Sequence, residues 1–358
     1  MDFEKFKEKE ISKKEALELF EDNENIFELF KFADSLRKEE VGDIVTYVVN
    51  RNINFTNICI GNCKFCAFRA NEYDKHAYFL DIDEIVKRSV EAKKFGCTEV
   101  CIQGGLHPKI DTYYQAEILK AVHEATKPYG DIHIHAFSPM EVYFGAENAG
   151  LTIKEALKIL KESGLNSMPG TAAEILDDEI RDELCPNKIK TGEWIYIIKE
   201  AHKMGIPTTS TIMYGHIEEY RHIVNHLFII KEIQEETNGF TEFVPLSFMY
   251  KNAPIYREGR ARAGATGIED LKMFAISRIV FRGLIKNIQA SWVKLGKKMV
   301  QVSLRCGAND VGGTLIEENI SRSAGAEHGV YMSVEEIKDM IKRVGLIPKE
   351  RTTLYKLL

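Results

Sequence analysis

The sequence predicts an α/β fold: a (β/α) barrel of the TIM type, fully or partly closed, with helices before it and a covering segment after it. Short β-branched apolar runs alternate with amphipathic helical segments from residue 53 onward, in at least six units. This alternation is typical of parallel strands joined by helical crossovers. No glycine-rich dinucleotide turn follows the first strand candidate, which favours a barrel over an open sheet. The 358 residues, 44% of them hydrophobic, suffice for one barrel-sized core.

Helices are expected before the barrel begins. Residues 13–48 carry helical apolar spacing and should pack against the lower end or the side of the barrel. The first barrel strand is expected over 53–56. A helix over 83–95 then ends at Gly96, directly before an apolar strand over 99–103.

The clearest helix lies between Thr152 and Gly164. Thr152 is a good N-cap, Glu155 three residues later completes a capping box, and Gly164 supplies the C-terminal stop. Another helix is expected from Thr191 to Gly205. The remaining strand candidates are 132–137, 165–168, 206–213, 240–246 and 284–290.

No proline-rich or low-complexity linker divides the chain, so we expect one structural unit with three parts. The first part is an N-terminal helical extension over 1–48. The second is the core barrel over 49–290. The third, over 291–358, should complete and cover the barrel.

The charge pattern narrows the classes of partner. The formal net charge is -6 and no basic run occurs, which argues against nucleic acid. No uninterrupted apolar run approaches the roughly 18 residues that suggest a membrane span. The N-terminal residues alternate in charge and lack the apolar stretch of a signal peptide. We therefore expect a cytoplasmic protein that binds neither nucleic acid nor a membrane.

Three of the seven cysteines, Cys59, Cys63 and Cys66, follow the first strand candidate within eight residues. Such clustering in a reducing compartment indicates metal binding rather than disulfides. Three protein ligands leave one metal position open to a substrate or cofactor, whereas structural sites are closed by four. Gly61 and Asn62 tolerate the unusual backbone angles that let a short loop bring the sulfur atoms together. The other cysteines are scattered: Cys97, Cys101, Cys185 and Cys306.

The spacing alone leaves two other metal sites open. One is a zinc knuckle in which one of the ten histidines supplies the fourth ligand. The other is a closed electron-transfer cluster with Cys97 or Cys101 as its fourth ligand.

The motif Cys-x3-Cys-x2-Cys, with Phe65 before the last cysteine, resembles the signature of radical S-adenosylmethionine enzymes. The resemblance implies that Cys59, Cys63 and Cys66 bind a 4Fe-4S cluster. It also implies that the amino and carboxylate groups of S-adenosylmethionine occupy the fourth iron, and that one electron generates a 5'-deoxyadenosyl radical.

Further residues at strand ends fit the same resemblance. It implies that Gly104 and Gly105, in Gln-Gly-Gly-Leu-His-Pro, contact the methionine end of S-adenosylmethionine. It implies that Glu174 binds the ribose hydroxyls or a substrate's ribityl chain. Taken alone, the glycines fit an ordinary βα turn and Glu174 a solvated loop carboxylate. Histidines at strand ends are not assigned a catalytic role: His107, His135 and His216.

Longer segments narrow the family. Pro-Gly-Thr-Ala-Ala-Glu, ending at Glu174, and Glu-Phe-Val-Pro-Leu-Ser-Phe-Met, from Glu242, most resemble the FO synthase subunit 2 family. The resemblance to the wider group of radical enzymes that make deazaflavin and menaquinone precursors covers about residues 45–315. The resemblance to the FO synthase subunit 2 family implies that tyrosine loses a hydrogen atom, its Cα–Cβ bond breaks, and the 4-hydroxybenzyl fragment joins 5-amino-6-(D-ribitylamino)uracil in deazaflavin coenzyme biosynthesis. The implied partners are FO synthase subunit 1 and a reductant protein such as ferredoxin or flavodoxin.

Other functions stay open from the sequence. The related menaquinone futalosine-pathway enzymes, aminofutalosine synthase and dehypoxanthine futalosine cyclase, share much of the motif set. The companion deazaflavin subunit fits the Gly-Leu-His-Pro region less well. An iron-sulfur redox sensor or electron carrier would hold a cluster without cleaving S-adenosylmethionine.

Overall fold

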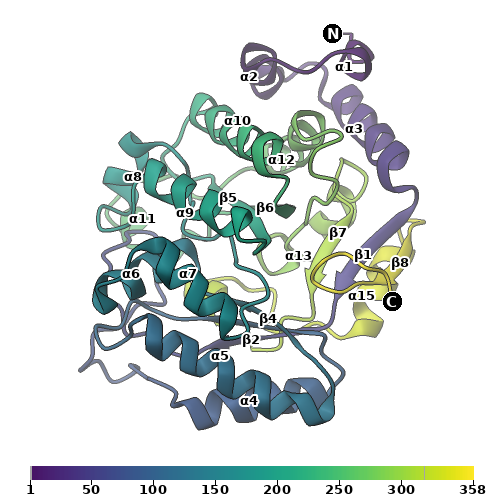
Figure 1. Ribbon diagram of the computed structural model, residues 1–358. Coiled ribbons are helices and arrows are strands. Elements are labelled where there is room, and N and C mark those ends of the chain that lie inside the picture. Colours follow the sequence, from purple (N-terminus) through teal and green to yellow (C-terminus); the bar gives the residue numbers. More distant parts are fainter. Residues whose placement is uncertain (1, 318) are drawn as a thin grey trace.

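The computed structural model describes residues 2–317 and 319–358 and consists of parallel strands surrounded by helices (Figure 1). The strands hydrogen-bond in three sheets, ordered β7-β1-β8, β2-β3-β4 and β5-β6, and every pairing between them is parallel. The strands are β1 (Ile44–Val48), β2 (Asn50–Asn54), β3 (Glu99–Gln103), β4 (His133–Ala136), β5 (Thr208–Tyr214), β6 (Phe240–Ser247), β7 (Asp310–Gly313) and β8 (Ile347–Glu350).

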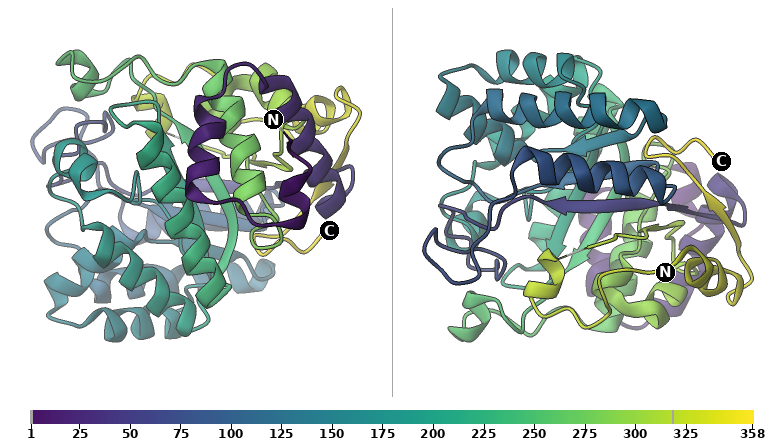
Figure 2. Two further views of the ribbon diagram at one scale, coloured as in Figure 1. Left: turned by 90° about the horizontal axis from the view of Figure 1, so that it is seen from above. Right: turned by 90° about the horizontal axis from the view of Figure 1, so that it is seen from below.

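The helices lie on the outside of these strands in all three views (Figures 1 and 2). Before the strands come α1 (Lys5–Glu8), α2 (Lys13–Glu21) and α3 (Ile26–Val41). Among and after the strands come α4 (Ile82–Lys94), α5 (Thr112–Thr126), the 3-10 helix η1 (Lys127–Tyr129), α6 (Pro139–Ala149), α7 (Ile153–Glu162), α8 (Asp178–Leu184), α9 (Thr191–Lys203), α10 (Tyr220–Thr237), α11 (Pro254–Arg257), α12 (Gly267–Val280), α13 (Trp292–Ser303), α14 (Ile320–Ser323) and α15 (Val334–Lys342). The expected alternation of parallel strands with helices is confirmed.

Single parallel bridges connect one sheet to the next. Ser167 bridges to β4 and Met168 to β5, so the strand expected over 165–168 is present as two bridging residues. In the same way Ile288 bridges to β6 and Gln289 to β7, within the strand expected over 284–290. A further bridge joins β2 to Ile316, beyond β7.

The helical prediction for 13–48 is wrong over its last residues, because 44–48 form strand β1 between β7 and β8. The sequence Ile-Val-Thr-Tyr-Val is β-branched and aromatic, which suits a pleated and buried strand. The next strand also begins earlier than the expected 53–56. Asn50 and Arg51 belong to β2 although they are polar, because Asn50 donates to Glu99 at 3.0 Å and Arg51 to Glu91 at 3.0 Å.

The expected capping box at the start of α7 is confirmed. The Glu155 amide donates to Thr152 Oγ1 at 3.3 Å, and the Thr152 amide donates to a carboxylate oxygen of Glu155 at 2.8 Å. These two bonds satisfy amide groups that the first helical turn leaves without partners. The stop at Gly164 agrees with its φ of 109°.

The last residues of the chain cover the amino-terminal ends of the strands. Arg351 is 2% exposed, and its guanidinium donates to both carboxylate oxygens of Asp310, the first residue of β7, at 2.6 and 3.0 Å. The Tyr355 hydroxyl donates to Glu242 of β6 at 2.5 Å. The opposite, carboxyl-terminal end of the strands is therefore the free end at which loops can build a site. None of the helices in the described ranges has the length and apolar content that crossing a bilayer requires.

Candidate active site at the carboxyl ends of the strands

The cysteine-bearing loop begins directly after β2 and is fixed to its surroundings through backbone hydrogen bonds. The Ile60 amide donates to the Leu106 carbonyl at 3.0 Å, which ties the loop to the end of β3. The Cys59 amide donates to the Ala70 carbonyl at 3.2 Å, and the Arg69 guanidinium donates to the Cys59 carbonyl at 2.9 Å. The loop thus closes on itself and holds its cysteines in place.

Cys59 and Cys63 place their thiols close to Gly61. The Gly61 amide donates to Cys59 Sγ at 3.3 Å, and a Cβ atom added to Gly61 would lie 3.2 Å from Cys59 Sγ and 3.9 Å from Cys63 Sγ. Burial raises the pKa of the Cys63 thiol to about 12 and also raises that of Cys66. Thiolates in such surroundings need positive charge beside them, which a bound metal centre supplies.

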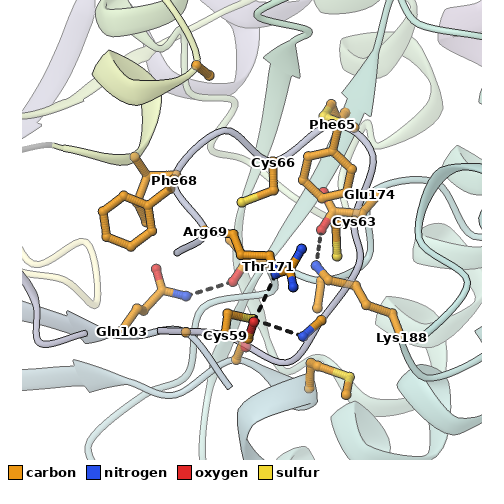
Figure 3. A pocket seen from close by; sticks show the side chains of 18 of the residues that line it. Cys59, Cys63, Phe65, Cys66, Phe68, Arg69, Gln103, Thr171, Glu174 and Lys188 are labelled. Carbon is orange, nitrogen blue, oxygen red and sulfur yellow. Dashed lines mark hydrogen bonds and ion pairs between the residues drawn. The ribbon is translucent and has the colours of Figure 1, made fainter. Parts of the chain in front are cut away.

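These thiols line a cavity of about 260 Å³ (Figure 3). Its walls come from the cysteine loop, the residues after β3, the start of α6 and the segment before α8. Every site residue expected from the sequence lies on this cavity: Cys59, Cys63, Cys66, Gly104, Gly105 and Glu174. The structure therefore brings together residues that are up to 115 positions apart in the chain.

The glycine pair has a packing role that needs no ligand. A Cβ on Gly104 would lie 2.6 Å from the Phe55 ring, and one on Gly105 would lie 2.4 Å from the Ile58 carbonyl oxygen. The Gly105 amide also donates to the Thr56 carbonyl at 2.8 Å. Only glycine lets the end of β3 approach the cysteine loop this closely.

Glu174 lies on the cavity wall and forms an ion pair with Lys188, whose Nζ atom is 2.5 Å from Oε1 of Glu174. Burial by itself lowers the pKa of Lys188, but the nearby Glu174 carboxylate and Cys63 thiol raise it overall, so the lysine is positively charged. Its ammonium lies 5.3 Å from the centre of the Phe65 ring, a cation–π distance. The sequence analysis did not single out Lys188, because its role depends on a contact made only in the fold.

Comparison with known proteins shows the family to which this chain belongs. The family model "Radical SAM superfamily" matches residues 53–230, and "CofH/MqnC C-terminal region" matches residues 237–358. A Methanocaldococcus jannaschii protein named 5-amino-6-(D-ribitylamino)uracil--L-tyrosine 4-hydroxyphenyl transferase is 91% identical over 358 residues, covering 100% of both chains. A Methanococcus maripaludis protein of the same name is 66% identical, again over 100% of both chains.

This chain belongs to the radical SAM superfamily and, within it, to the family of these transferases.

Solved radical SAM structures share the fold at low identity. Methylornithine synthase (PylB) is 17% identical, with a TM-score of 0.72 over 96% of each chain. The hydrogenase maturase HydG is 18% identical, with a TM-score of 0.75 over 98% of this chain and 75% of that one. These TM-scores support the expected TIM-type radical SAM fold.

The family membership implies an iron-sulfur cluster and S-adenosylmethionine, and the donor set fits such a group. Among the described residues, the three thiols are not a group whose ligand atoms all lie within 4.8 Å of one another, as ligands of a single zinc ion would be. A wider arrangement suits a centre of several metal atoms. Cys97 and Cys101, considered above as fourth ligands, do not line the cavity.

A second carboxylate, Glu141, also lines the cavity and was missed by the sequence analysis. It accepts hydrogen bonds from the Gly104 amide at 2.9 Å and from the Ser138 hydroxyl at 2.6 Å. Burial raises the pKa of this carboxyl, while these bonds act in the opposite direction. The available signal was Ser138-x-x-Glu141, a capping box at the start of α6.

The strand-end histidines of this family member lie outside the cavity lining. His135 of β4 is buried, with Nδ1 2.6 Å from Ser167 Oγ. His216 Nδ1 is 3.0 Å from a carboxylate oxygen of Glu218. The His107 ring packs 4.8 Å from the Phe79 ring. Each of the three histidines thus contacts a neighbouring side chain outside the cavity.

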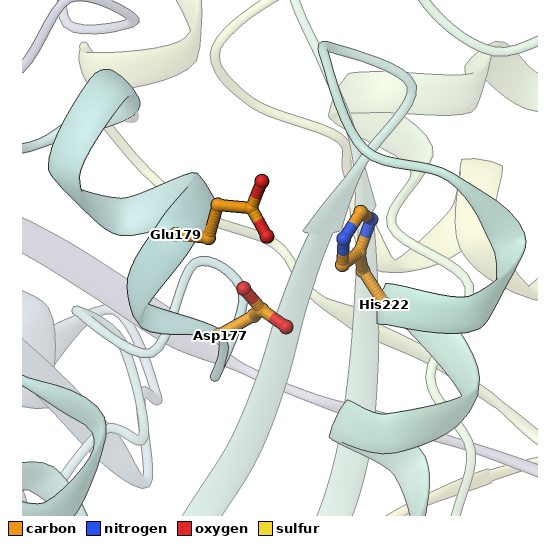
Figure 4. A group of neighbouring side chains, drawn as sticks. All are labelled: Asp177, Glu179 and His222. Carbon is orange, nitrogen blue, oxygen red and sulfur yellow. The ribbon is translucent and has the colours of Figure 1, made fainter.

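Asp177, Glu179 and His222 form a separate group whose ligand atoms all lie within 4.8 Å of one another (Figure 4). The Glu219 amide donates to His222 Nδ1 at 2.9 Å, so this nitrogen acts as an acceptor. Nε2 is buried and has no hydrogen-bond partner among the described residues. Glu179 is exposed, and no metal is assigned to the group.

Proposed function

We propose that this chain cleaves the Cα–Cβ bond of L-tyrosine and transfers the 4-hydroxybenzyl fragment to 5-amino-6-(D-ribitylamino)uracil, a step in deazaflavin coenzyme biosynthesis. The observation that carries the proposal is the 91% identity, over 358 residues, to a relative named for this transfer. The cavity lined by three thiols supports it independently, because the radical SAM reaction needs a metal centre with an open position.

Cys59, Cys63 and Cys66 would hold a 4Fe-4S cluster, with S-adenosylmethionine at the remaining position. When bound, this pair supplies one-electron chemistry and a radical able to abstract hydrogen from tyrosine. The backbone at Gly104 and Gly105 lies beside the Cys59 side chain, where it can contact the methionine end of S-adenosylmethionine. Glu174 can accept hydrogen bonds from ribose hydroxyls, because its ion pair with Lys188 holds the carboxylate in place.

The protein's own contribution is to position the substrates and to exclude water. Apolar side chains dominate the cavity wall, so a radical formed there meets few groups other than the bound substrates. Glu141 and Gln103 are polar groups of the cavity wall that hydrogen bonds hold in place. Glu141 accepts from the Ser138 hydroxyl, and Gln103 donates to Thr171 at 2.8 Å. The apolar wall includes Phe65, Phe68, Leu106, Met140, Met213, Leu246 and Phe248.

We further propose that the strands close into a full barrel and that the three expected parts, 1–48, 49–290 and 291–358, fold as one unit. The parallel bridges at 167–168, at 288–289 and between β2 and Ile316 support closure, because they link the three sheets in sequence. The contact of Arg351 with Asp310 supports a single unit.

The proposed setting is the cytoplasm, where reduced cysteines persist. The proposed partners are FO synthase subunit 1, which would act in the next step, and an electron carrier of the ferredoxin or flavodoxin type. The charge of -6 supports partners other than nucleic acid.

The deciding experiment is anaerobic incubation of the cluster-loaded protein with S-adenosylmethionine, dithionite, L-tyrosine and 5-amino-6-(D-ribitylamino)uracil, followed by mass analysis. We expect a hydroxybenzyl adduct of the uracil and 5'-deoxyadenosine. 5'-Deoxyadenosine without the adduct would overturn the substrate assignment and lead to the menaquinone-pathway substrates. An intact cluster that releases no 5'-deoxyadenosine would instead favour a redox sensor or electron carrier.

A further inference from the structure

A second hollow of about 550 Å³, here called the outer groove, lies beside the cysteine loop. Cys63, Cys66, Ala67 and Arg69 line both the cavity and this outer groove. Only one turn of the loop, residues 63–69, therefore separates the surface of the protein from the proposed cluster. Because the rate of electron transfer falls steeply with distance, residues 63–69 give the short route from the protein surface to the proposed metal centre.

The far wall of the groove comes from residues close to α11 and α14. The Asn252 side chain donates to the Ser323 carbonyl at 2.9 Å, which joins these two segments. The Ile255 amide donates to the Lys64 carbonyl at 2.9 Å, which fixes α11 against the cysteine loop. The groove is thus built from three segments that are held together by hydrogen bonds.

The groove carries an excess of positive charge. Lys64, Arg69 and Arg257 line it, and within the described ranges no carboxylate lies at ion-pair distance from any of them. Arg69 and Arg257 donate instead to neutral oxygens, at 3.0 Å to Asn71 and 2.8 Å to Asn252. Among the described residues that line the groove, the acid is Glu258, and it lies 3.3 Å from Arg260. This local excess stands out on a chain whose net charge is -6.

We propose that this groove is the docking surface for an acidic one-electron carrier protein. The carrier gives one electron through residues 63–69 to the metal centre; the carrier is oxidised, the centre is reduced, and no atom or proton is transferred. Positive charge around the entry point attracts an acidic partner and raises the association rate. The inference rests on the proposed function, because only a centre that consumes electrons needs such a partner.

The test uses the cluster-loaded protein and an acidic 4Fe-4S ferredoxin as the probe. Lys64→Glu and Arg257→Glu reverse two charges of the groove, while Lys31→Glu makes the same change on an exposed residue of α3, on the opposite side of the molecule (Figure 1). Calorimetric titration with oxidised ferredoxin measures binding without turnover. The double variant should bind about tenfold more weakly at low ionic strength, with the difference fading at high salt. Lys31→Glu should bind like the unsubstituted protein.

The second readout is 5'-deoxyadenosine formation driven by reduced ferredoxin or by reduced methyl viologen, a small cation that needs no docking surface. Arg257→Glu alone, which leaves the cysteine loop unaltered, should be slow with ferredoxin and unchanged with the viologen. Ferredoxin affinity within twofold of the Lys31→Glu control, or equal losses with both reductants, would overturn the docking surface. If the unsubstituted protein forms no 5'-deoxyadenosine with the viologen, the proposed function fails, and the calorimetric comparison still decides the docking question.

Discussion

The Nζ atom of Lys188 lies 2.5 Å from Oε1 of Glu174, and the two side chains are only 15% and 13% exposed. Glu174 has a φ of 44°, in the left-handed region that favours glycine. The ion pair therefore stabilises a carboxylate on a backbone that is itself costly, at the wall of the cavity. Such an arrangement is typical of a side chain held in place for binding.

Replacing Lys188 by Met should lower the free energy of unfolding by about 3 kcal/mol, because it leaves the Glu174 carboxylate buried without its partner. Urea denaturation of the protein measures this loss. Adding Glu174→Gln to the Lys188→Met variant should recover part of it, since the unpaired charge is then gone. Equal stability of the single and double variants would contradict the coupling between these residues.

Cys63→Ala should abolish both the iron-sulfur absorbance and 5'-deoxyadenosine release, because two thiolates cannot retain the cluster. Iron content and the visible spectrum after anaerobic reconstitution measure the first effect. Cys306→Ala is the matched control, since Cys306 is buried outside the cavity lining and should leave the iron content unchanged. A normal iron content in Cys63→Ala would refute the ligand assignment.

Gly105→Ala should displace the cysteine loop and reduce cluster occupancy. The added methyl group would lie 2.4 Å from the Ile58 carbonyl oxygen and 2.9 Å from Cys59 Cβ, so the backbone must shift. Gly192→Ala, near the start of α9, meets no atom within 4 Å and should stabilise the protein by about 0.5 kcal/mol through helix propensity. Iron content and thermal unfolding distinguish the two variants. Full cluster occupancy in Gly105→Ala would show that the loop accommodates the change.

Arg351→Met should lower the free energy of unfolding by about 3 kcal/mol or more, because it leaves the Asp310 carboxylate buried and unpaired. Arg343→Met is the control, since its pair with Asp339 is exposed and should contribute at most about 0.5 kcal/mol. Chemical denaturation of both variants tests the difference. Similar losses would mean that the C-terminal segment contributes little to closing the amino-terminal end of the strands.

Stability should fall as the pH drops from 6.5 toward 4, in part because His226 is buried as a neutral imidazole. Burial lowers the pKa of His226 to about 3, against about 6.5 in the unfolded chain. Below pH 6.5 the unfolded chain binds a proton at His226 and the folded protein does not, which favours unfolding. The contribution of His226 to the free energy of unfolding is therefore fully present above pH 6.5 and is lost as the pH falls. For a shift of this size the loss is about 2 kcal/mol at pH 5.

His226→Asn tests this pH dependence. An Asn side-chain oxygen can accept the hydrogen bond that the Leu176 amide now donates to Nδ1 at 3.0 Å, but it does not titrate. Unfolding free energies at pH 7.5 and pH 5 should therefore differ less in the variant, by about 2 kcal/mol. An unchanged difference would show that His226 is not responsible.

Local signals made the cysteine loop, the glycine pair and the capping box of α7 predictable. Each depends on residues within a few positions of one another, so spacing in the sequence reports the structure directly. The strand at 44–48 was missed because it continues a helical region, and the early start of β2 was missed because its first residues are polar. Their burial becomes acceptable only when Glu99 and Glu91 supply partners.

The sequence by itself determined which groups the site contains: three thiols within eight residues, and the glycines that lie beside them. Only the tertiary structure decided which charged groups surround them. Lys188 reaches Glu174, Glu141 reaches Gly104, and Arg351 reaches Asp310 from separate segments. A buried charge is tolerable only beside its partner, and partners distant in the chain meet only once the strands and helices have packed.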